Sequence, residues 1–432
     1  MSDTSANLQL PYLAPAQAQK HVTVNEALLR LDALTQLTVV SATTPAQPAS
    51  PSDGAIYILP PGKTGAAWGP MANGALAYWR DGFWEEIAPK PGWRAFVQDA
   101  GVGVAWTGSA WWTEAPQEDQ LINGGFGLWR RGLSFSDVGQ GYGPDRWAIL
   151  QSGTAKNAVS RQLSGLSAAP HCARLARPVG TVGGAALALV QILESTRARA
   201  LAGRFVSVSL RLRLGATFSG GGPALSLISG TVADDGLAAF AAGWTGAATI
   251  ASSTPAIPAD GGFHLVTLSG VVPADVQELA VKIGFTPNGT AGANDWIEIA
   301  AVRLEAGLPS PYAPRPMEVE RALAEAYFET TYDDGISPGS ASDPGRFAFL
   351  VAGAGIASNA RLPMAFRSLK RKTPMVALYA PGGSVAGRVG DSGGASRTAA
   401  AIAIGQSGFE VQYTDAVAAG GVWFHYTADA EL

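Results

Sequence analysis

The chain has 432 residues, of which 47% are hydrophobic and 15% are charged, a composition that supports packed interiors and excludes a disordered chain. Thirty basic and 34 acidic residues leave a net charge of −4, so the counterion release that drives nucleic-acid binding is weak and no DNA or RNA partner is expected. One cysteine and four scattered histidines exclude a disulfide framework and a histidine-rich metal site.

The length and the turn-forming residues indicate several β-rich domains. A chain this long suggests about three domains. The 53 glycines and 28 prolines disfavour long helices and favour short strands joined by tight turns. The first residues have neither the cationic segment nor the apolar run of a secretory signal, and no apolar run is long enough to cross a bilayer. We therefore expect a soluble protein that is made in the cytoplasm and not inserted into a membrane.

Residues 1–44 are predicted to form an N-terminal arm and a short helix. Leucines recur with helical spacing at Leu28, Leu31 and Leu34, which is typical of an amphipathic helix. The following Ser/Thr/Ala/Pro stretch, residues 41–53, is interpreted as a linker. The leucine face is predicted to mediate oligomer formation or docking to a partner, with packing onto its own domain as the alternative.

Residues 45–117 are predicted to form a small antiparallel β domain. Strand-like runs occur at 55–59, 75–79 and 83–87, and Asp81-Gly82 between the last two is a hairpin turn signal. Seven of the twelve tryptophans lie in this segment. A domain this small needs large side chains to bury enough area, so we interpret them as core residues, with a sugar-stacking platform as the alternative.

Residues 118–316 are predicted to form a β-sandwich of the jelly-roll kind. Apolar residues nearly alternate with polar ones along 205–214, which indicates a strand with one face in water. Arg211 and Arg213 lie on that polar face, where solvation or pairing with acidic sugars are the alternatives. No helical interruption is expected between the strands. The clearest strands are predicted at 187–193, 205–214, 264–271, 279–285 and 296–304.

Residues 317–432 are predicted to form a short helix followed by a second, smaller β-sandwich. Pro314 and Pro316 mark the boundary, and residues 317–328 form a helix with an acidic first turn. Strands are predicted at 347–351, 375–379, 409–413 and 422–426. The fold class is therefore mostly β, with a short N-terminal helix and a small antiparallel unit followed by two sandwich domains.

The sequence contains little that indicates catalysis. The run 335–339 matches a nucleophile elbow around Ser337, but a proline-containing turn follows it where that motif needs a helix. Adjacent carboxylates at 85–86, 234–235 and 333–334 point to opposite faces of a strand, whereas glycosidases need two that converge. We therefore predict no catalytic residue, no cofactor and no metal, with a structural calcium ion at the acidic turn 234–236 as a minor alternative.

Two sets of sequence segments resemble known families. Residues 10–28 (LPYLAPAQAQKHVTVNEAL), 53–57 and 77–84 resemble an uncharacterised N-terminal domain family of alphaproteobacterial prophages and gene transfer agents, over about residues 8–115. A second set resembles a sandwich domain common in phage fibre and spike proteins, which is similar to carbohydrate-binding modules. The segments of this second set are 121–132 (LINGGFGLWRRG), 142–147, 302–307 and 312–316.

The combination resembles the head-spike (head-fibre) family of Rhodobacter-type gene transfer agents, with an ordinary prophage tail fibre as the close alternative. The resemblance implies a protein on the surface of a phage-like particle, released by lysis, that binds the host's capsular polysaccharide without cleaving it. It also implies a homotrimer and a capsid or spike partner. A polysaccharide-degrading spike and a connector that binds no glycan are the competing interpretations.

Sugar binding needs aromatic rings for pyranose faces and planar polar groups for hydroxyls. In the central segment, Trp244 follows Asp234 and Asp235, while Asn294 and Trp296 follow a turn. These five residues are the predicted carbohydrate site, with core packing as the alternative for both tryptophans. Weak single sites would act together through the copies in a trimer and on a particle.

Overall fold

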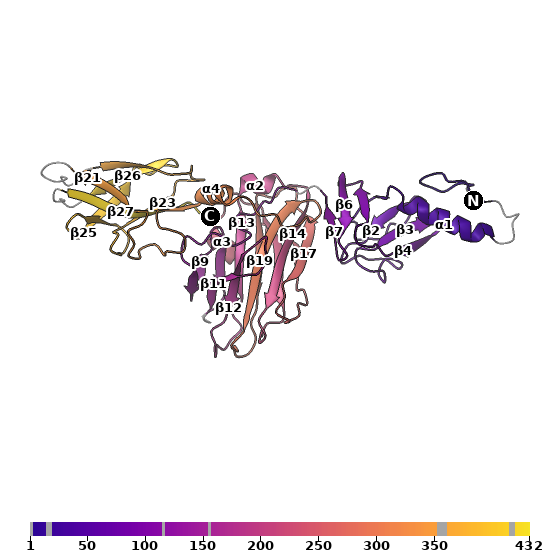
Figure 1. Ribbon diagram of the computed structural model, residues 1–432, viewed down its shortest axis with the longest axis horizontal. Coiled ribbons are helices and arrows are strands. Elements are labelled where there is room, and N and C mark those ends of the chain that lie inside the picture. The colour runs from indigo at the N-terminus through magenta and orange to yellow at the C-terminus, as the bar shows by residue number, and fades with distance from the viewer. Residues whose placement is uncertain (1–2, 14–19, 115–116, 154–156, 352–360, 414–419) are drawn as a thin grey trace. The chain divides into compact units, whose positions relative to one another are not determined.

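The computed structural model describes residues 3–13, 20–114, 117–153, 157–351, 361–413 and 420–432 (Figure 1). The chain is mostly β and divides into two compact units. The first unit comprises Met1–Glu118 with Gly307–Pro311, and the second comprises Asp119–Ala306 with Tyr312–Leu432. The first unit thus contains the predicted arm, helix and Trp-rich domain together, and the second contains both predicted sandwiches.

The first unit has one helix and two small sheets. Its helix α1 runs from Lys20 to Leu34 and contains the three leucines Leu28, Leu31 and Leu34. Strands β2, β3 and β4 form one antiparallel sheet, and the other has the order β1-β5-β6-β7 with β1 parallel to β5. The strands are β1 Thr38–Val39, β2 Ile56–Ile58, β3 Leu76–Arg80, β4 Phe83–Ile87, β5 Arg94–Val97, β6 Val102–Trp106 and β7 Trp111–Thr113.

The interpretation of residues 41–53 as a linker is wrong, because their backbone is part of the packed unit. Ser41 is buried and forms a parallel bridge with Tyr57, and Ala46 forms another with Thr64. The hydroxyl of Ser41 also accepts the backbone N–H of Thr43 at 3.0 Å. Composition alone suggested a linker here, but these backbone pairings fix the segment against β2 and the chain that follows it.

The tryptophans of this unit pack mainly against one another. Asp81 and Gly82 have φ values of 49° and 86°, which form the predicted β3–β4 turn. Trp84 from β4 lies edge-on to Trp68 with ring centroids 5.1 Å apart, and both are buried. The predicted core role of these two side chains is confirmed.

The second unit contains a sandwich of two antiparallel six-stranded sheets. We call them sheet A, with the order β16-β15-β18-β13-β10-β9, and sheet B, with the order β17-β14-β19-β12-β11-β8. The strands of sheet A are β9 Gln140–Tyr142, β10 Ala148–Gln151, β13 Leu187–Leu193, β15 Pro223–Gly230, β16 Ala248–Ser253 and β18 Glu278–Phe285. Those of sheet B are β8 Ser134–Ser136, β11 Ala158–Leu163, β12 His171–Ala176, β14 Phe205–Leu214, β17 His264–Val271 and β19 Trp296–Ala306.

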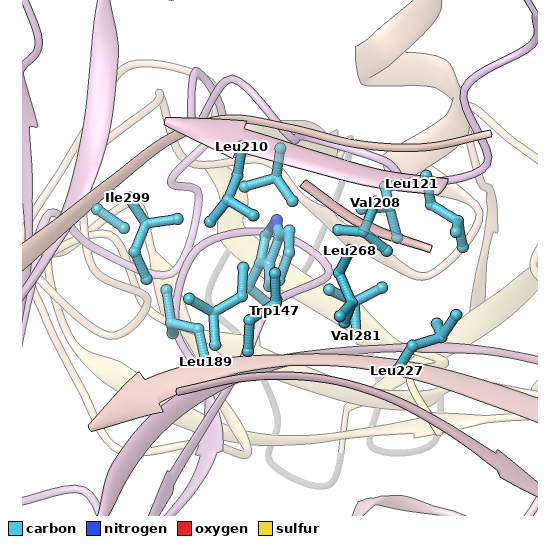
Figure 2. Packing of buried hydrophobic residues seen from close by; sticks show 14 of the residues in the cluster. Leu121, Trp147, Leu189, Val208, Leu210, Leu227, Leu268, Val281 and Ile299 are labelled. Carbon is cyan, nitrogen blue, oxygen red and sulfur yellow. The ribbon is translucent and has the colours of Figure 1, made fainter. Parts of the chain in front are cut away.

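Apolar side chains from the two sheets meet in one core (Figure 2). Leu189 and Val281 from sheet A lie on one side of the Trp147 indole, and Leu210 and Ile299 from sheet B lie on the other. Trp129 is buried in the same cluster. Both tryptophans, which belong to the segments 121–132 and 142–147, are therefore core residues.

The segment 121–132 is largely buried and packs against this core. The Asn123 amide group donates to the carbonyl of Leu128 at 2.8 Å and accepts the Leu128 backbone N–H at 2.9 Å. The Trp147 indole N–H donates to the Asn123 carbonyl at 3.1 Å. Gly124 lies so close to β19 that a Cβ there would be 1.9 Å from the carbonyl oxygen of Val302. These contacts give the segment a packing role.

Two expectations for the sandwich are wrong. Short helices interrupt the strands, namely α2 at Ser195–Arg199 and α3 at Leu237–Ala242. On β14, Ser207 and Ser209 are buried, although the alternation predicted a face in water. The Ser207 and Ser209 positions tolerate burial because a serine hydroxyl can bond within the sheet, as the 2.9 Å contact between the Ser207 and Ser269 hydroxyl oxygens shows.

The C-terminal part follows helix α4, Met317–Glu325, which is three residues shorter than predicted. Its strands surround a separate apolar core, and β27 pairs with four others. His425 on β27 is buried, and its ring nitrogens contact the Thr331 hydroxyl and the Ser342 carbonyl. The strands are β20 Phe328–Thr330, β21 Phe347–Val351, β22 Arg361–Ala365, β23 Met375–Tyr379, β24 Arg388–Asp391, β25 Ser396–Ile402, β26 Gly408–Tyr413 and β27 Gly420–Asp429.

Candidate functional site

The structure separates the predicted carbohydrate residues into two groups on different sheets. Asn294 and Trp296 lie at the start of β19 in sheet B. Asp234, Asp235 and Trp244 lie around α3, in the connection between β15 and β16 of sheet A. They therefore do not form the single site that their order along the sequence suggested.

The group on sheet B is engaged in holding loops together. The guanidinium carbon of Arg174 lies 4.3 Å from the centroid of the Trp296 ring, so one face of this ring is already covered. The backbone N–H of Asn294 donates to the Thr217 hydroxyl at 2.9 Å. Asp295 between them is buried and pairs with Arg177 at 2.9 Å. These contacts favour a structural role for this group.

The acidic turn on sheet A is also structural. Asp234 has a φ of 57° and accepts the backbone N–H of Ser195, the first residue of α2, at 3.0 Å. Asp235 is exposed. Glu278, the first residue of β18, is fully buried and forms no ion pair with a described residue. Burial, and next the Asp235 and Asp234 carboxylates, raise the pKa of Glu278 to about 8.

Trp244 borders a pocket of about 620 Å³ on the outer face of sheet A. Core residues of these strands, such as Leu189 and Val281, point into the sandwich, so Ala188 and Lys282 beside them point outward. The connection after α3 forms one wall of the pocket. The residues that line it are Gly139, Gln140, Leu150, Gln151, Ser152, Ala186, Ala188, Ile228, Phe240, Ala241, Gly243, Trp244, Ala247, Thr249 and Lys282.

Trp244 is held rigidly in this wall. Its indole lies over the backbone of Gly230 at the end of β15, where a Cβ would be 2.9 Å from the ring. The Phe240 ring meets it edge-on at a centroid distance of 4.8 Å. Trp244 is only 5% exposed, and its indole N–H has no hydrogen-bond partner among the described residues. It therefore supplies a fixed edge to the pocket, while the half-buried Phe240 supplies the more accessible ring.

Polar groups surround the apolar part of the pocket. Gln140 and Gln151 carry side-chain amides, and Thr249 carries an exposed hydroxyl on the edge strand β16. Lys282 on β18 supplies the cation. None of the described lining residues is a carboxylate. The pocket thus combines apolar surface and aromatic rings with a few hydrogen-bonding groups and one positive charge.

Sequence reasoning identified Trp244 but missed Phe240, Lys282 and the two glutamines. Phe240 lies in an alanine-rich stretch that showed no strand pattern. Lys282 interrupts the apolar run of β18 at an outward position, and that interruption was the available signal. Gln140 and Gln151 lie on short strands more than 85 residues before Phe240 in the chain, so only the sheet pairing brings them to this face.

The predicted docking residues lie on α1 in the first unit. Leu31 is 55% exposed, and Leu28 and Leu34 are half-buried. On the same helix Asp32 is buried and accepts the Ser5 hydroxyl at 2.6 Å, which ties the arm to the helix. Part of the leucine face therefore packs within its own unit, and Leu31 remains accessible.

Two further findings concern metals and membranes. Among the residues that the structure describes, no three His, Cys, Asp or Glu side chains form a group suited to a metal ion. No helix in the described ranges has the length and apolar character needed to cross a membrane.

Comparison with known sequences finds one family model that matches part of the first unit. The family model described as "Protein of unknown function (DUF2793)" matches residues 24–112. This match lies within the first unit. No curated protein matches the chain.

Solved structures match about half of the chain at low identity. The enzymatically active domain of tailspike protein 4 from bacteriophage CBA120 is 15% identical, with a TM-score of 0.26, over 44% of this chain and 21% of that one. A putative sugar-binding protein from Bacteroides thetaiotaomicron is 10% identical, with a TM-score of 0.29, over 44% of this chain and 100% of that one. A carbohydrate-binding module of the β-sandwich superfamily is 8% identical, with a TM-score of 0.29, over 54% and 93%.

Proposed function

We propose that this chain is a spike or fibre protein of a phage-like particle, of the gene-transfer-agent kind, that binds the host's capsular polysaccharide without cleaving it. The observation that carries this proposal is the pocket on the outer face of sheet A. Its volume of about 620 Å³ falls within the range of about 300–1,000 Å³ that ligand sites usually occupy. It offers room for one or two sugar units.

The chemistry of the pocket suits a sugar. The C–H faces of a pyranose pack against apolar and aromatic surface, which Phe240, Ile228 and Leu150 provide. Sugar hydroxyls both donate and accept hydrogen bonds, and a side-chain amide such as that of Gln140 does the same. Because sheet strands and a packed helix hold these groups, little conformational entropy is lost on binding.

The absence of acidic groups among the described lining residues favours binding over hydrolysis. Glycoside hydrolysis needs two carboxyl groups about 5–10 Å apart across the scissile bond. Glu278 has the raised pKa of a general acid but is fully buried, so it does not reach a substrate. A degrading enzyme would therefore need carboxylates from elsewhere.

The proposal that the protein is part of a phage-like particle rests on the resemblance of segments 10–28 and 121–132 to prophage and phage-fibre families. In a trimer, and with many spikes per particle, weak pockets act together and the effective concentration of sites rises. Capture of a repetitive polymer such as a capsule therefore does not require a tight single site.

The test fills the pocket without disturbing the core. Thr249 is exposed on the edge strand β16 of sheet A and lines the pocket, so Thr249→Trp places an indole in it. Thr267 is exposed on the edge strand β17 of sheet B, and Thr267→Trp is the matched control. Binding of fluorescently labelled protein to capsulated and acapsular cells is measured by flow cytometry.

We expect wild-type protein and Thr267→Trp to bind capsulated cells and to leave acapsular cells unstained, and Thr249→Trp to bind neither. Equal staining of both cell types by the wild type would refute the proposal. Purified capsule incubated with the protein should show no new reducing ends or unsaturated products. Their appearance would favour the polysaccharide-degrading alternative.

A further inference from the structure

We propose that the pocket on sheet A selects a sugar unit that carries a negative charge, which the ammonium group of Lys282 binds. This inference rests on the proposed function and specifies its ligand class as an acidic glycan. It starts from the position of Lys282, the cation among the described residues that line the pocket.

Lys282 lies in the middle of sheet A. Its partners across the sheet are Val190 on β13 and Ser226 on β15, which carry no charge. Its side chain is half-buried, and no hydrogen bond or ion pair with a described residue engages its ammonium. Partial burial of an ammonium group is unfavourable because it removes water from the charge, and no anion among the described residues compensates for this.

The arginines of sheet B show the opposite arrangement. Arg174 and Arg213 both pair with the buried carboxylate of Glu298, at 2.6 and 2.5 Å. Their charge is therefore compensated within the fold. Arg213, which the sequence offered as a partner for acidic sugars, is satisfied in this way, whereas Lys282 has no such partner among the described residues.

No Asp or Glu side chain is among the described residues that line the pocket with Lys282. The acidic residue on the same strand, Glu278, lies four positions away, roughly 13 Å along β18. Burial and its acidic neighbours raise the pKa of Glu278 to about 8, so it is mostly neutral at pH 7. Since the whole chain has a net charge of −4, an acidic polymer gains attraction at this position and not from the protein as a whole.

The experiment compares polymers that differ only in charge. Polygalacturonate and its methyl ester share a backbone, and esterification removes the carboxylate charge. Dextran sulfate and dextran form a second pair that distinguishes sulfate from carboxylate. Binding of the full chain to immobilised polymer is measured by biolayer interferometry at 0.15 M and 0.5 M NaCl.

Three variants separate charge from shape. Lys282→Gln removes the charge and keeps a polar side chain, and Lys282→Arg keeps the charge. Arg211→Gln removes a half-buried cation from the outer face of sheet B and is the matched control. Thermal unfolding of each variant checks that the fold is retained.

We expect the wild type to bind at least one acidic polymer about tenfold more tightly than its neutral counterpart, as a charge-assisted hydrogen bond provides. Lys282→Gln should remove this preference and leave the affinity for the neutral polymer unchanged, while Lys282→Arg and Arg211→Gln should keep it. The difference in affinity between the acidic and the neutral polymer should be smaller at the higher NaCl concentration.

The failures of the two proposals are distinguishable. Equal binding of acidic and neutral polymers, or an acidic preference that survives in Lys282→Gln, overturns the assignment of Lys282. The proposed function still stands in that case if Thr249→Trp abolishes binding. A wild-type protein that binds neither these polymers nor capsulated cells overturns both.

Discussion

Glu278 shows how a single residue can make the stability of the sandwich depend on pH. It lies fully buried at the start of β18, with the Asp234 and Asp235 carboxylates nearby, and no ion pair with a described residue would compensate its charge. Ionisation in this place would leave an uncompensated buried charge. Burial therefore raises the pKa of Glu278 to about 8.

The sign of the pH effect follows from this raised pKa. In the unfolded chain the carboxyl group ionises near its ordinary pKa of 4.5, while in the folded chain it stays neutral up to about pH 8. The contribution of Glu278 to folding is complete below pH 4.5 and is lost as the pH rises through the folded-state pKa. The upper limit of this loss is about 5 kcal/mol.

We predict that Glu278→Gln reduces the pH dependence of stability. The difference in Tm between the variant and the wild type should increase in favour of the variant from pH 5 to pH 8.5. The increase should correspond to a change of about 2 kcal/mol or more in the relative free energy of unfolding. Differential scanning calorimetry across this range provides the measurement. Asp275→Asn, at an exposed carboxylate of the same sandwich, is the control and should leave the pH profile unchanged. Parallel profiles for wild type and Glu278→Gln would contradict the raised pKa.

At the scale of elements, the wall of the pocket depends on how the connection after α3 packs against sheet A. Trp244 contacts the backbone of β15 at Gly230, and Leu237 of α3 belongs to the same buried cluster. The glycine matters through its lack of a side chain, because a Cβ there would be 2.9 Å from the indole. A strand residue with a side chain would push the wall outward.

Gly230→Ala should therefore displace Trp244. We expect a destabilisation of about 1–3 kcal/mol and weaker glycan binding, because the pocket changes shape. Gly221→Ala is the matched control, since nothing lies within 4 Å of the Cβ it adds. The two variants are compared by calorimetry and by binding to capsulated cells. Equal Tm values would show that the indole does not rest on Gly230.

At the scale of the whole molecule, the predicted trimer rests on the resemblance to spike proteins and on the exposed side of α1. Leu31 is exposed on this helix, whereas Asp32 beside it anchors the arm of its own unit. A large apolar side chain in water is costly alone and contributes favourably in an interface. Self-association through this face would also give the weak glycan pockets their multivalency.

Leu31→Gln should weaken the trimer. Val22 is also exposed on α1 and lies nine residues earlier, on the opposite side of the helix, so Val22→Gln is the matched control. Sedimentation velocity should show a trimer for the wild type and for Val22→Gln, and a smaller species for Leu31→Gln. A monomeric wild type at micromolar concentration would refute the trimer.

The positions of many strands followed from the sequence by itself. The predicted strands 187–193, 205–214 and 264–271 coincide with β13, β14 and β17, and the turn at Asp81-Gly82 lies where it was expected. These features are local, because alternation and turn-forming residues act within a few positions of the chain. The mostly β fold follows from the same local signals.

Only the tertiary structure decided which side chains form a site. The pocket combines residues from Gly139 to Lys282 that meet because six strands pair in the order of sheet A. Asn294 and Trp296, which were predicted to form one site with Trp244, lie at the start of β19 in the other sheet. The neutral state of Glu278 and the uncompensated charge of Lys282 also arise from their surroundings. Burial and proximity depend on the whole fold, so the chemistry of this site appears only once the sheets are assembled.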